Sequence, residues 1–150
     1  MIEIRDYVPA DWPAVARIHD QARRHELQLA GLSAAFVPLK IAAINEGLFD
    51  YPGLFVAERA GQVLGFAACT DTELAWLYVD PAVMRQGVGR ALATHALEAF
   101  PTIHSIEVLV GNAPAHHLYE QLGFTVQTVT HGRMPGNEAF AVSVEVFERG

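Results

Sequence analysis

Polar and apolar residues alternate at the start of the chain, and this pattern predicts a short strand around Ile2 and Ile4. Helical spacing takes over after Asp11, a residue type that caps helices, and Pro13 is tolerated in the first helical turn. The apolar stripe of this first helix is formed by Val15, Ile18 and Ala22. A second, shorter helix is predicted from Ile41, Ile44 and Leu48.

Strand patterns dominate from residue 54 onward. Residues 54–58 and 63–70 flank a turn at Ala60-Gly61 and are predicted to form a hairpin, and a third run at 73–79 is stopped by Asp80-Pro81. The remaining elements are predicted as a helix at 87–100, a strand at 106–110, a helix at 113–122 and two strands at 124–130 and 140–147. The order β-α-α-β-β-β-α-β-α-β-β indicates one α/β domain over residues 1–150.

Composition excludes several classes of protein. Hydrophobic residues make up 51% of the 150 residues, which argues against disorder. The net charge of −7 argues against a broad nucleic-acid interface and mildly favours a cationic ligand. A single cysteine, Cys69, rules out an intramolecular disulfide and suits a reducing cytoplasm. Neither a secretory signal nor an apolar run long enough to cross a membrane is visible, so we expect a cytoplasmic protein.

A glycine-containing loop carries the first functional signal. The strand ending at Val79 is followed by a loop and by Arg85-Gln86-Gly87-Val88-Gly89-Arg90, where the next helix begins. The first turn of a helix has unpaired N–H groups, and glycines let a phosphate approach them, so residues 86–90 can wrap a pyrophosphate. The loop lacks the third glycine of a Rossmann fingerprint and the lysine of a P-loop. A tight strand-to-helix turn without a ligand is therefore the alternative.

Two motifs resemble those of the GNAT N-acetyltransferase superfamily. Residues 77–81 and 85–92 are similar to its acetyl-CoA-binding motif, with a departure at Met84, where the family has arginine or glutamine. The second motif matches at every defining position, and its residues are Asn112, Ala115, Leu118, Tyr119, Gly123 and Phe124. The resemblance covers nearly the whole chain, except that residues 31–53 and the last 20 or so residues are the least informative.

The resemblance implies a fold and a mode of binding. The fold is a mixed, mostly antiparallel sheet, flanked by helices and splayed between its fourth and fifth strands, with acetyl-CoA in the opening. The backbone of Leu77, Tyr78 and Val79 would pair with pantetheine, and an N–H there would polarise the thioester carbonyl. Asn112 and Ala115 would contact the same molecule. The arginines Arg85 and Arg90 would add positive charge next to the pyrophosphate.

Two residues are candidates for proton transfer. In the family, a tyrosine at the position of Tyr119 protonates the departing thiolate, and the alternative for Tyr119 is an aromatic that only packs. Some members place a catalytic glutamate on the strand before the glycine loop, where Glu73 stands at the matching distance from Gly87. Glu73 would deprotonate the attacking amine, and its alternative is a glutamate at the exposed start of a strand. His131 is a second candidate base.

Other polar residues are assigned structural roles. None of the seven histidines has metal-site spacing, so no metal is expected. Arg23-Arg24-His25 is interpreted as a solvated helix end, and Cys69 as a small core residue. Trp76 is predicted to pack in the core or to floor the acceptor pocket, which residues 31–53 and 132–139 would shape.

The sequence therefore predicts direct transfer of an acetyl group from acetyl-CoA to a primary amine, on a small molecule rather than on a protein. No covalent acyl-enzyme is required. A homodimer through the last strands is compatible with the family. Three alternatives stay open: another acyl group or acceptor on the same fold, a CoA-binding sensor or subunit without catalysis, and a nucleotide-binding module.

Overall fold

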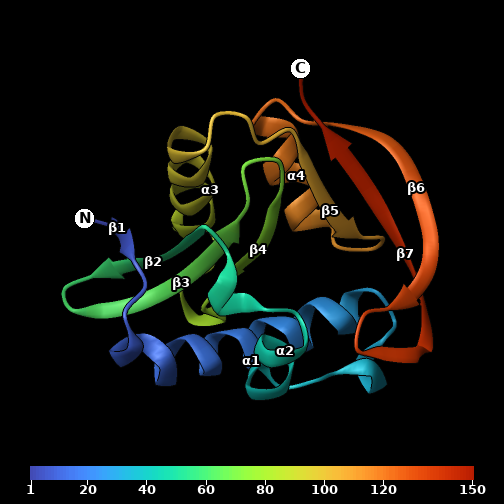
Figure 1. Ribbon diagram of the computed structural model, residues 1–150, viewed down its shortest axis with the longest axis horizontal. Coiled ribbons are helices and arrows are strands. Elements are labelled where there is room, and N and C mark those ends of the chain that lie inside the picture. The colour runs from blue at the N-terminus through green and yellow to red at the C-terminus, as the bar shows by residue number, and fades with distance from the viewer.

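The computed structural model describes residues 1–150, and its elements follow the predicted order (Figure 1). The strands are β1 Glu3–Asp6, β2 Gly53–Arg59, β3 Gln62–Cys69, β4 Leu74–Val79, β5 Ser105–Leu109, β6 Thr125–Met134 and β7 Asn137–Glu148. The α-helices are α1 Trp12–Leu29, α2 Leu39–Asn45, α3 Val88–Ala99 and α4 Ala113–Gln121. No helix combines the length and the apolar character that a membrane span requires.

The strands form two antiparallel sheets instead of one continuous sheet. The first sheet has the order β1-β2-β3-β4 and the second has the order β5-β7-β6. Only an isolated parallel bridge between Glu73 and Ser105 joins β4 to β5, and beyond it the two strands diverge (Figure 1). This divergence confirms the splay that the family resemblance implied, and it leaves one edge of β4 without a partner strand.

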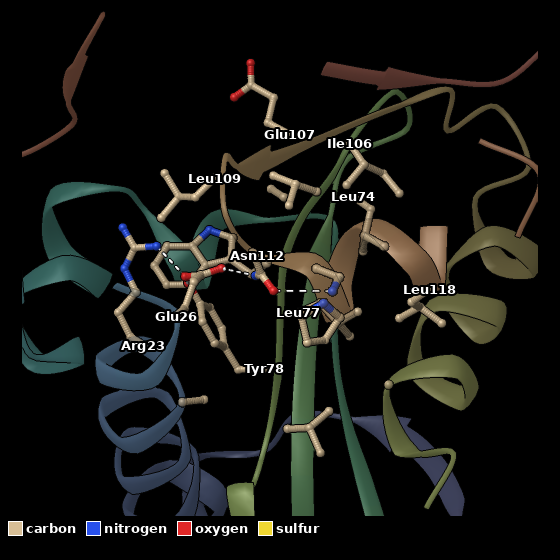
Figure 2. Close-up of a pocket in the computed structure, with 18 of the residues that line it drawn as sticks. Arg23, Glu26, Leu74, Leu77, Tyr78, Ile106, Glu107, Leu109, Asn112 and Leu118 are labelled. Atoms are coloured by element: carbon tan, nitrogen blue, oxygen red, sulfur yellow. Dashed lines mark hydrogen bonds and ion pairs between the residues drawn. The ribbon is translucent and has the colours of Figure 1, made fainter. Parts of the chain in front are cut away.

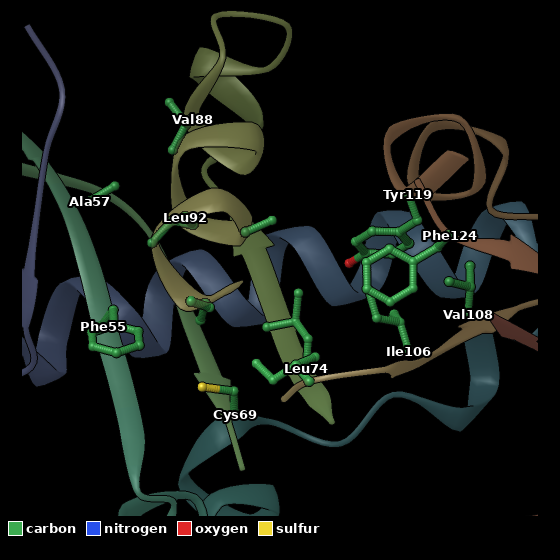
Figure 3. Packing of buried hydrophobic residues seen from close by; sticks show 14 of the residues in the cluster. Phe55, Ala57, Cys69, Leu74, Val88, Leu92, Ile106, Val108, Tyr119 and Phe124 are labelled. Carbon is green, nitrogen blue, oxygen red and sulfur yellow. The ribbon is translucent and has the colours of Figure 1, made fainter. Parts of the chain in front are cut away.

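The helices cover both faces of the first sheet. Helix α3 packs on β2, β3 and β4, while α1 packs on β3 and β4 from the opposite side. One core cluster, on the α3 side, includes Leu92, Ile106 and Phe147 and joins the two sheets (Figure 3). A second cluster lies under α1 and α2 and includes Ile18 and Phe66. The two sheets are thus held at a fixed angle by a shared apolar core on one side of the opening.

The stripe predicted for the second helix is wrong. Ile41 and Ile44 are 46% and 80% exposed, whereas α2 buries Leu39, Ala42 and Ala43. Two small alanines give α2 a flat contact face against its neighbours, and the large isoleucines point to solvent. Leu48 is buried as predicted, but it lies in a 3-10 turn after the helix.

Asp11 precedes α1 as predicted, but its carboxylate does not cap that helix. It accepts a hydrogen bond from the Val8 N–H at 2.9 Å and two from the Arg5 guanidinium at 2.8 Å each. Arg5 lies on β1, so this buried carboxylate fastens the start of α1 to the edge of the first sheet.

The last two strands are longer than predicted. They extend through most of residues 132–139 and meet at a tight turn whose Gly136 has a φ of +74°. Met134 near this turn packs with Leu27, Ala35 and Leu109. Contacts with α1 and β5 therefore bring the end of the hairpin back to the divergence of β4 and β5.

Candidate active site

A cavity of about 1080 Å³ lies where β4 and β5 diverge, and α1 and the starts of α3 and α4 border it. All the predicted site residues except Gln86 line this one cavity: Glu73, Leu77, Tyr78, Val79, Arg85, Gly87, Val88, Gly89, Arg90, Asn112, Ala115 and Tyr119. The side chain of Gln86 instead accepts a hydrogen bond from Arg59 at 3.1 Å on the exposed surface. Residues 31–53 contribute Ala35 and Tyr51 among others, and residues 132–139 contribute Met134 and Pro135.

The glycine loop presents free backbone donors to the cavity. Gly87 has a φ of +84° and caps α3 without a side-chain hydrogen bond. The first N–H of the helix with an intrahelical partner is that of Ala91, which donates to the Gly87 carbonyl at 3.0 Å. The N–H groups of Val88, Gly89 and Arg90 are therefore open at the positive end of the helix dipole, where an anion is stabilised.

The space beside Gly89 belongs to the cavity. A Cβ placed on Gly89 would come within 3.5 Å of Val79 Cγ2 and 3.6 Å of Leu118 Cδ2, so a side chain would fill the gap between β4 and α4. Arg85 and Arg90 line the same end and form no ion pair within the chain. Their charge is available to a bound anion.

Asp80 holds the start of the loop in place. Its buried carboxylate accepts a hydrogen bond from the Ala82 N–H at 2.9 Å and one from Arg17 Nη1 at 3.1 Å. Arg17 lies on α1, so the loop between β4 and α3 is tied to the helix that covers the sheet. A short 3-10 turn over Pro81–Val83 follows, and Arg85 then adopts a φ of +63°, which is strained for a residue with a side chain.

The unpaired edge of β4 faces the cavity. The Asp80 N–H donates to Leu64 on β3 at 2.8 Å, which assigns Asp80, and with it Tyr78, to the β3 side. Because backbone groups alternate along a strand, the N–H and C=O groups of Leu77 and Val79 point to the other edge. An extended ligand can pair with them there, as the resemblance implied.

Tyr119 reaches the cavity from α4. Its side chain is 5% exposed, packs edge-to-face on Phe124 and Phe147, and forms no hydrogen bond within the protein (Figure 3). No fully enclosed polar atom of the chain lacks a partner, so the Tyr119 hydroxyl must be open to the cavity. Burial, with a contribution from Glu26, raises the pKa of Tyr119 and keeps the phenol protonated.

Two carboxylates lie where β4 and β5 begin to separate. Glu73 is half-buried just before β4, and burial raises its pKa, as does the nearby negative charge of Glu107 on β5. Glu107 was not predicted as a site residue, although it also lines the cavity. The sequence did carry a signal for this position: Glu107 is a charged residue between the apolar residues Ile106 and Val108 of a predicted strand. Its side chain therefore lies on the face opposite to theirs, and the structure shows Ile106 and Val108 buried and Glu107 exposed.

A polar network at the opposite wall was also missed. Figure 2 shows Glu26 on α1 receiving hydrogen bonds from Arg23 and Asn112. The Tyr78 hydroxyl donates to the same carboxylate at 3.3 Å. The predicted solvated end at residues 23–25 is therefore wrong for Arg23, which lines the cavity between Glu26 and Met134. Helix α1 continues to Leu29, so these positions lie within the helix and one side faces the cavity.

Trp76, Cys69 and His131 were the other residues with predicted roles. Trp76 belongs to the core under α1, as predicted, and it also lines the cavity; its role in an acceptor pocket stays a prediction. Cys69 is buried in the core, and burial raises the pKa of its thiol to about 11. His131 lies on β6, outside the residues that line the cavity, where its ring contacts the Ser143 hydroxyl at 2.7 Å. It is therefore not placed to act as the base.

Comparison with known proteins agrees with this architecture. The acetyltransferase (GNAT) domain family matches residues 50–126. A mycothiol acetyltransferase of Gordonia bronchialis is 31% identical over 91% of this chain and 48% of its own length. The crystal structure of the ribosomal-protein-S18-alanine N-acetyltransferase from Escherichia coli has a TM-score of 0.71 and 26% identity, over 99% of this chain and 93% of that one.

A third relative shares the fold. The structure of yncA from Salmonella typhimurium, described as a putative acetyltransferase with its cofactor acetyl-CoA, has a TM-score of 0.70 at 22% identity, over 98% of this chain and 92% of that one. The chain belongs to the GNAT acetyltransferase family. It spans about half the length of the Gordonia relative. Its matches to two other mycothiol acetyltransferases cover 34% and 30% of the lengths of those proteins.

Proposed function

We propose that this chain transfers the acetyl group of acetyl-CoA directly to a primary amine of a small molecule. One observation carries the proposal. A single cavity joins the free N–H groups at the start of α3, the open edge of β4 and the unpartnered hydroxyl of Tyr119. These are the groups that an acyl-CoA and its reacting thioester require.

The residues present fit acetyl-CoA. The N–H groups of Val88, Gly89 and Arg90 would hold the pyrophosphate, with charge from Arg85 and Arg90. The backbone of Leu77 and Val79 would pair with the amide groups of pantetheine. When bound, acetyl-CoA supplies an acetyl group on sulfur that an amine can attack. The gap beside Gly89 would admit the chain of this molecule between β4 and α4.

Glu73 would remove the proton that the amine must lose. Its raised pKa makes it a stronger base than an exposed glutamate, and Glu107 contributes to that rise. As the new C–N bond forms and the C–S bond breaks, the carboxylate of Glu73 would take the amine proton, directly or through a water molecule. Glu107 itself is the second candidate for this role because it lines the same part of the cavity.

Tyr119 would return a proton to the departing sulfur. Its phenol has a raised pKa and remains protonated, so it can donate. The same desolvation would raise the pKa of a thiol in this cavity, so the phenol and the thiol would remain matched. Asn112 would set the position of Tyr119, because its side-chain oxygen accepts from the Ala115 N–H at 3.3 Å and thereby caps α4.

Release of free thiol from acetyl-CoA, measured across a panel of amines, tests this proposal. We expect amine-dependent release that falls roughly 100-fold in Tyr119→Phe and in Glu73→Gln, the range of a lost acid or base. Tyr7→Phe is the matched control, since Tyr7 packs on Phe49 away from the cavity. Binding of acetyl-CoA without release from any amine would favour the CoA-binding sensor, and stabilisation by ATP or NAD alone would favour the nucleotide-binding module.

A further inference from the structure

The two ends of the cavity carry opposite charge. The end at the glycine loop has the arginines Arg85 and Arg90, both without an ion-pair partner. The other end lies between α1, α2 and the start of β4. Its acidic lining residues are Glu26, Glu46, Glu73 and Glu107. Arg23 also lies at this end. This difference separates a region suited to phosphates from a region suited to cations.

Most of the negative charge at the acidic end is uncompensated. Arg23 is paired with Glu26, as Nη1 of its guanidinium lies 2.5 Å from the carboxylate. Glu46, Glu73 and Glu107 form no ion pair within the chain. Burial lowers the pKa of His19, a histidine that lines this cavity, and favours its neutral form. Arg23 also acts electrostatically on Glu46, so the four carboxylates of this end face one arginine, and a bound cation would meet a wall of net negative charge.

Aromatic rings line the space between these carboxylates. Tyr51, Trp76 and Tyr78 all border the cavity here, and Trp76 and Tyr78 lie edge-to-face at 6.2 Å. The pKa of Tyr51 is raised by burial and also by the charges of Glu73 and Glu46, so its ring lies within electrostatic reach of both carboxylates. An alkylammonium group is attracted both to carboxylates and to aromatic faces, so this wall matches that group.

The position of the reacting nitrogen follows from a separate observation. The hydroxyl of the buried residue Tyr119 opens to the cavity and has no hydrogen-bond partner within the protein, and Glu73 borders the same cavity. An amine that reacts near these two groups leaves the rest of its chain to extend along Tyr51 toward Glu46. Glu46 follows the end of α2 and is exposed at the rim.

We infer that the acceptor is an aliphatic amine that carries a second positive charge, a diamine or polyamine, whose distal ammonium group lies against Glu46 and Tyr51. This inference rests on the proposed function, since it names the acceptor of the same reaction. The acetylated nitrogen loses its charge during transfer. The distal ammonium keeps its charge, and its contact with Glu46 and Tyr51 would fix the position of the substrate along the cavity. A neutral or anionic group at the distal position loses this interaction or is repelled.

Three substrates of equal chain length test the charge at the distal position: cadaverine, pentylamine and δ-aminovalerate. Their distal groups are cationic, neutral and anionic. With acetyl-CoA and the native chain, we expect kcat/KM for cadaverine to exceed that for pentylamine about tenfold, the worth of one charge-assisted hydrogen bond. δ-Aminovalerate should be the poorest substrate. Equal rates for the three amines, or a lysine peptide that exceeds cadaverine, would overturn the inference and leave the acetyltransferase proposal standing.

Glu46→Gln tests the named contact. It should lower the ratio of kcat/KM for cadaverine over pentylamine about tenfold, mainly through KM. Glu98→Gln on α3 is the matched control, because Glu98 is exposed outside this cavity and its change alters net charge equally. An unchanged ratio in Glu46→Gln contradicts the assignment of Glu46. Absence of acetylation of any amine contradicts the proposed function instead, so the two failures are distinguishable.

Discussion

The side-chain amide of Asn112 donates a hydrogen bond to Glu26 Oε2 at 3.1 Å, and this contact ties the start of α4 to the last turn of α1 (Figure 2). The other end of the same amide caps α4 through the Ala115 N–H. One residue therefore joins the wall that carries Arg23 and Glu26 to the helix that carries Tyr119. The distance between the two walls of the cavity depends on this link.

Replacement of Asn112 separates its two roles. Asn112→Ala removes both the cap and the link to Glu26, and we expect the free energy of unfolding to fall by about 1 kcal/mol, or roughly 2–4 °C in Tm. Asn112→Ser keeps a capping oxygen but is too short to replace the donor to Glu26. Its stability should stay close to native while kcat falls because α4 is no longer held against α1. Thermal unfolding and thiol-release kinetics measure the two effects, and native kcat in Asn112→Ser would contradict this role.

Gly89→Ala should affect binding more than folding. The added Cβ meets only ordinary van der Waals contacts with Val79 and Leu118, and alanine favours a helix, so stability should be unchanged or higher by up to about 1 kcal/mol. The methyl group occupies the gap proposed for acetyl-CoA, so the Kd for acetyl-CoA should rise. Calorimetric titration measures this value. Gly132→Ala on β6 is the control, because nothing lies within 4 Å of its Cβ, and an equal effect in both variants would argue against the gap as the binding path.

The pH dependence of the reaction should report on the carboxylate pair. Burial and the charge of Glu107 raise the pKa of Glu73 above 4.5, so the acid limb of the kcat/KM profile should lie above that pH. Glu107→Gln removes one cause of the rise, the pKa of Glu73 then falls, and the base stays ionised to lower pH. The acid limb should therefore move to lower pH. A loss of activity at every pH in Glu107→Gln would assign the base to Glu107 instead.

Asp11 should stabilise the fold in a pH-dependent way. The hydrogen bonds from Arg5 hold the pKa of this carboxyl below its ordinary 3.8, so the stabilisation is present above about that pH and is lost as the pH falls through the folded-state pKa. Asp11→Asn should lower the free energy of unfolding near neutral pH by about 2 kcal/mol, the cost of a charged hydrogen bond. Urea unfolding at several pH values measures the difference, which should shrink on acidification. A constant difference would exclude this ion pair as its cause.

Local sequence patterns determined much of this protein. The order of all eleven strands and α-helices follows from apolar periodicity and turn residues, because these signals come from neighbours in the chain. The glycine loop was predictable for the same reason, since Gly87 and Gly89 act through their own backbone at the start of α3. The motif around Asn112 and Tyr119 likewise identified α4 as part of the site.

Tertiary structure decided the groups that meet across the cavity. Arg23 was interpreted as part of a solvated helix end, and Glu26 was not predicted at all, because no local pattern reveals that Tyr78 and Asn112 come to contact Glu26. The charge of Glu107 raises the pKa of Glu73 only because β5 approaches the start of β4 at one bridge. Local spacing can assign a residue to one side of its own element, but only long-range packing decides which other elements face that side.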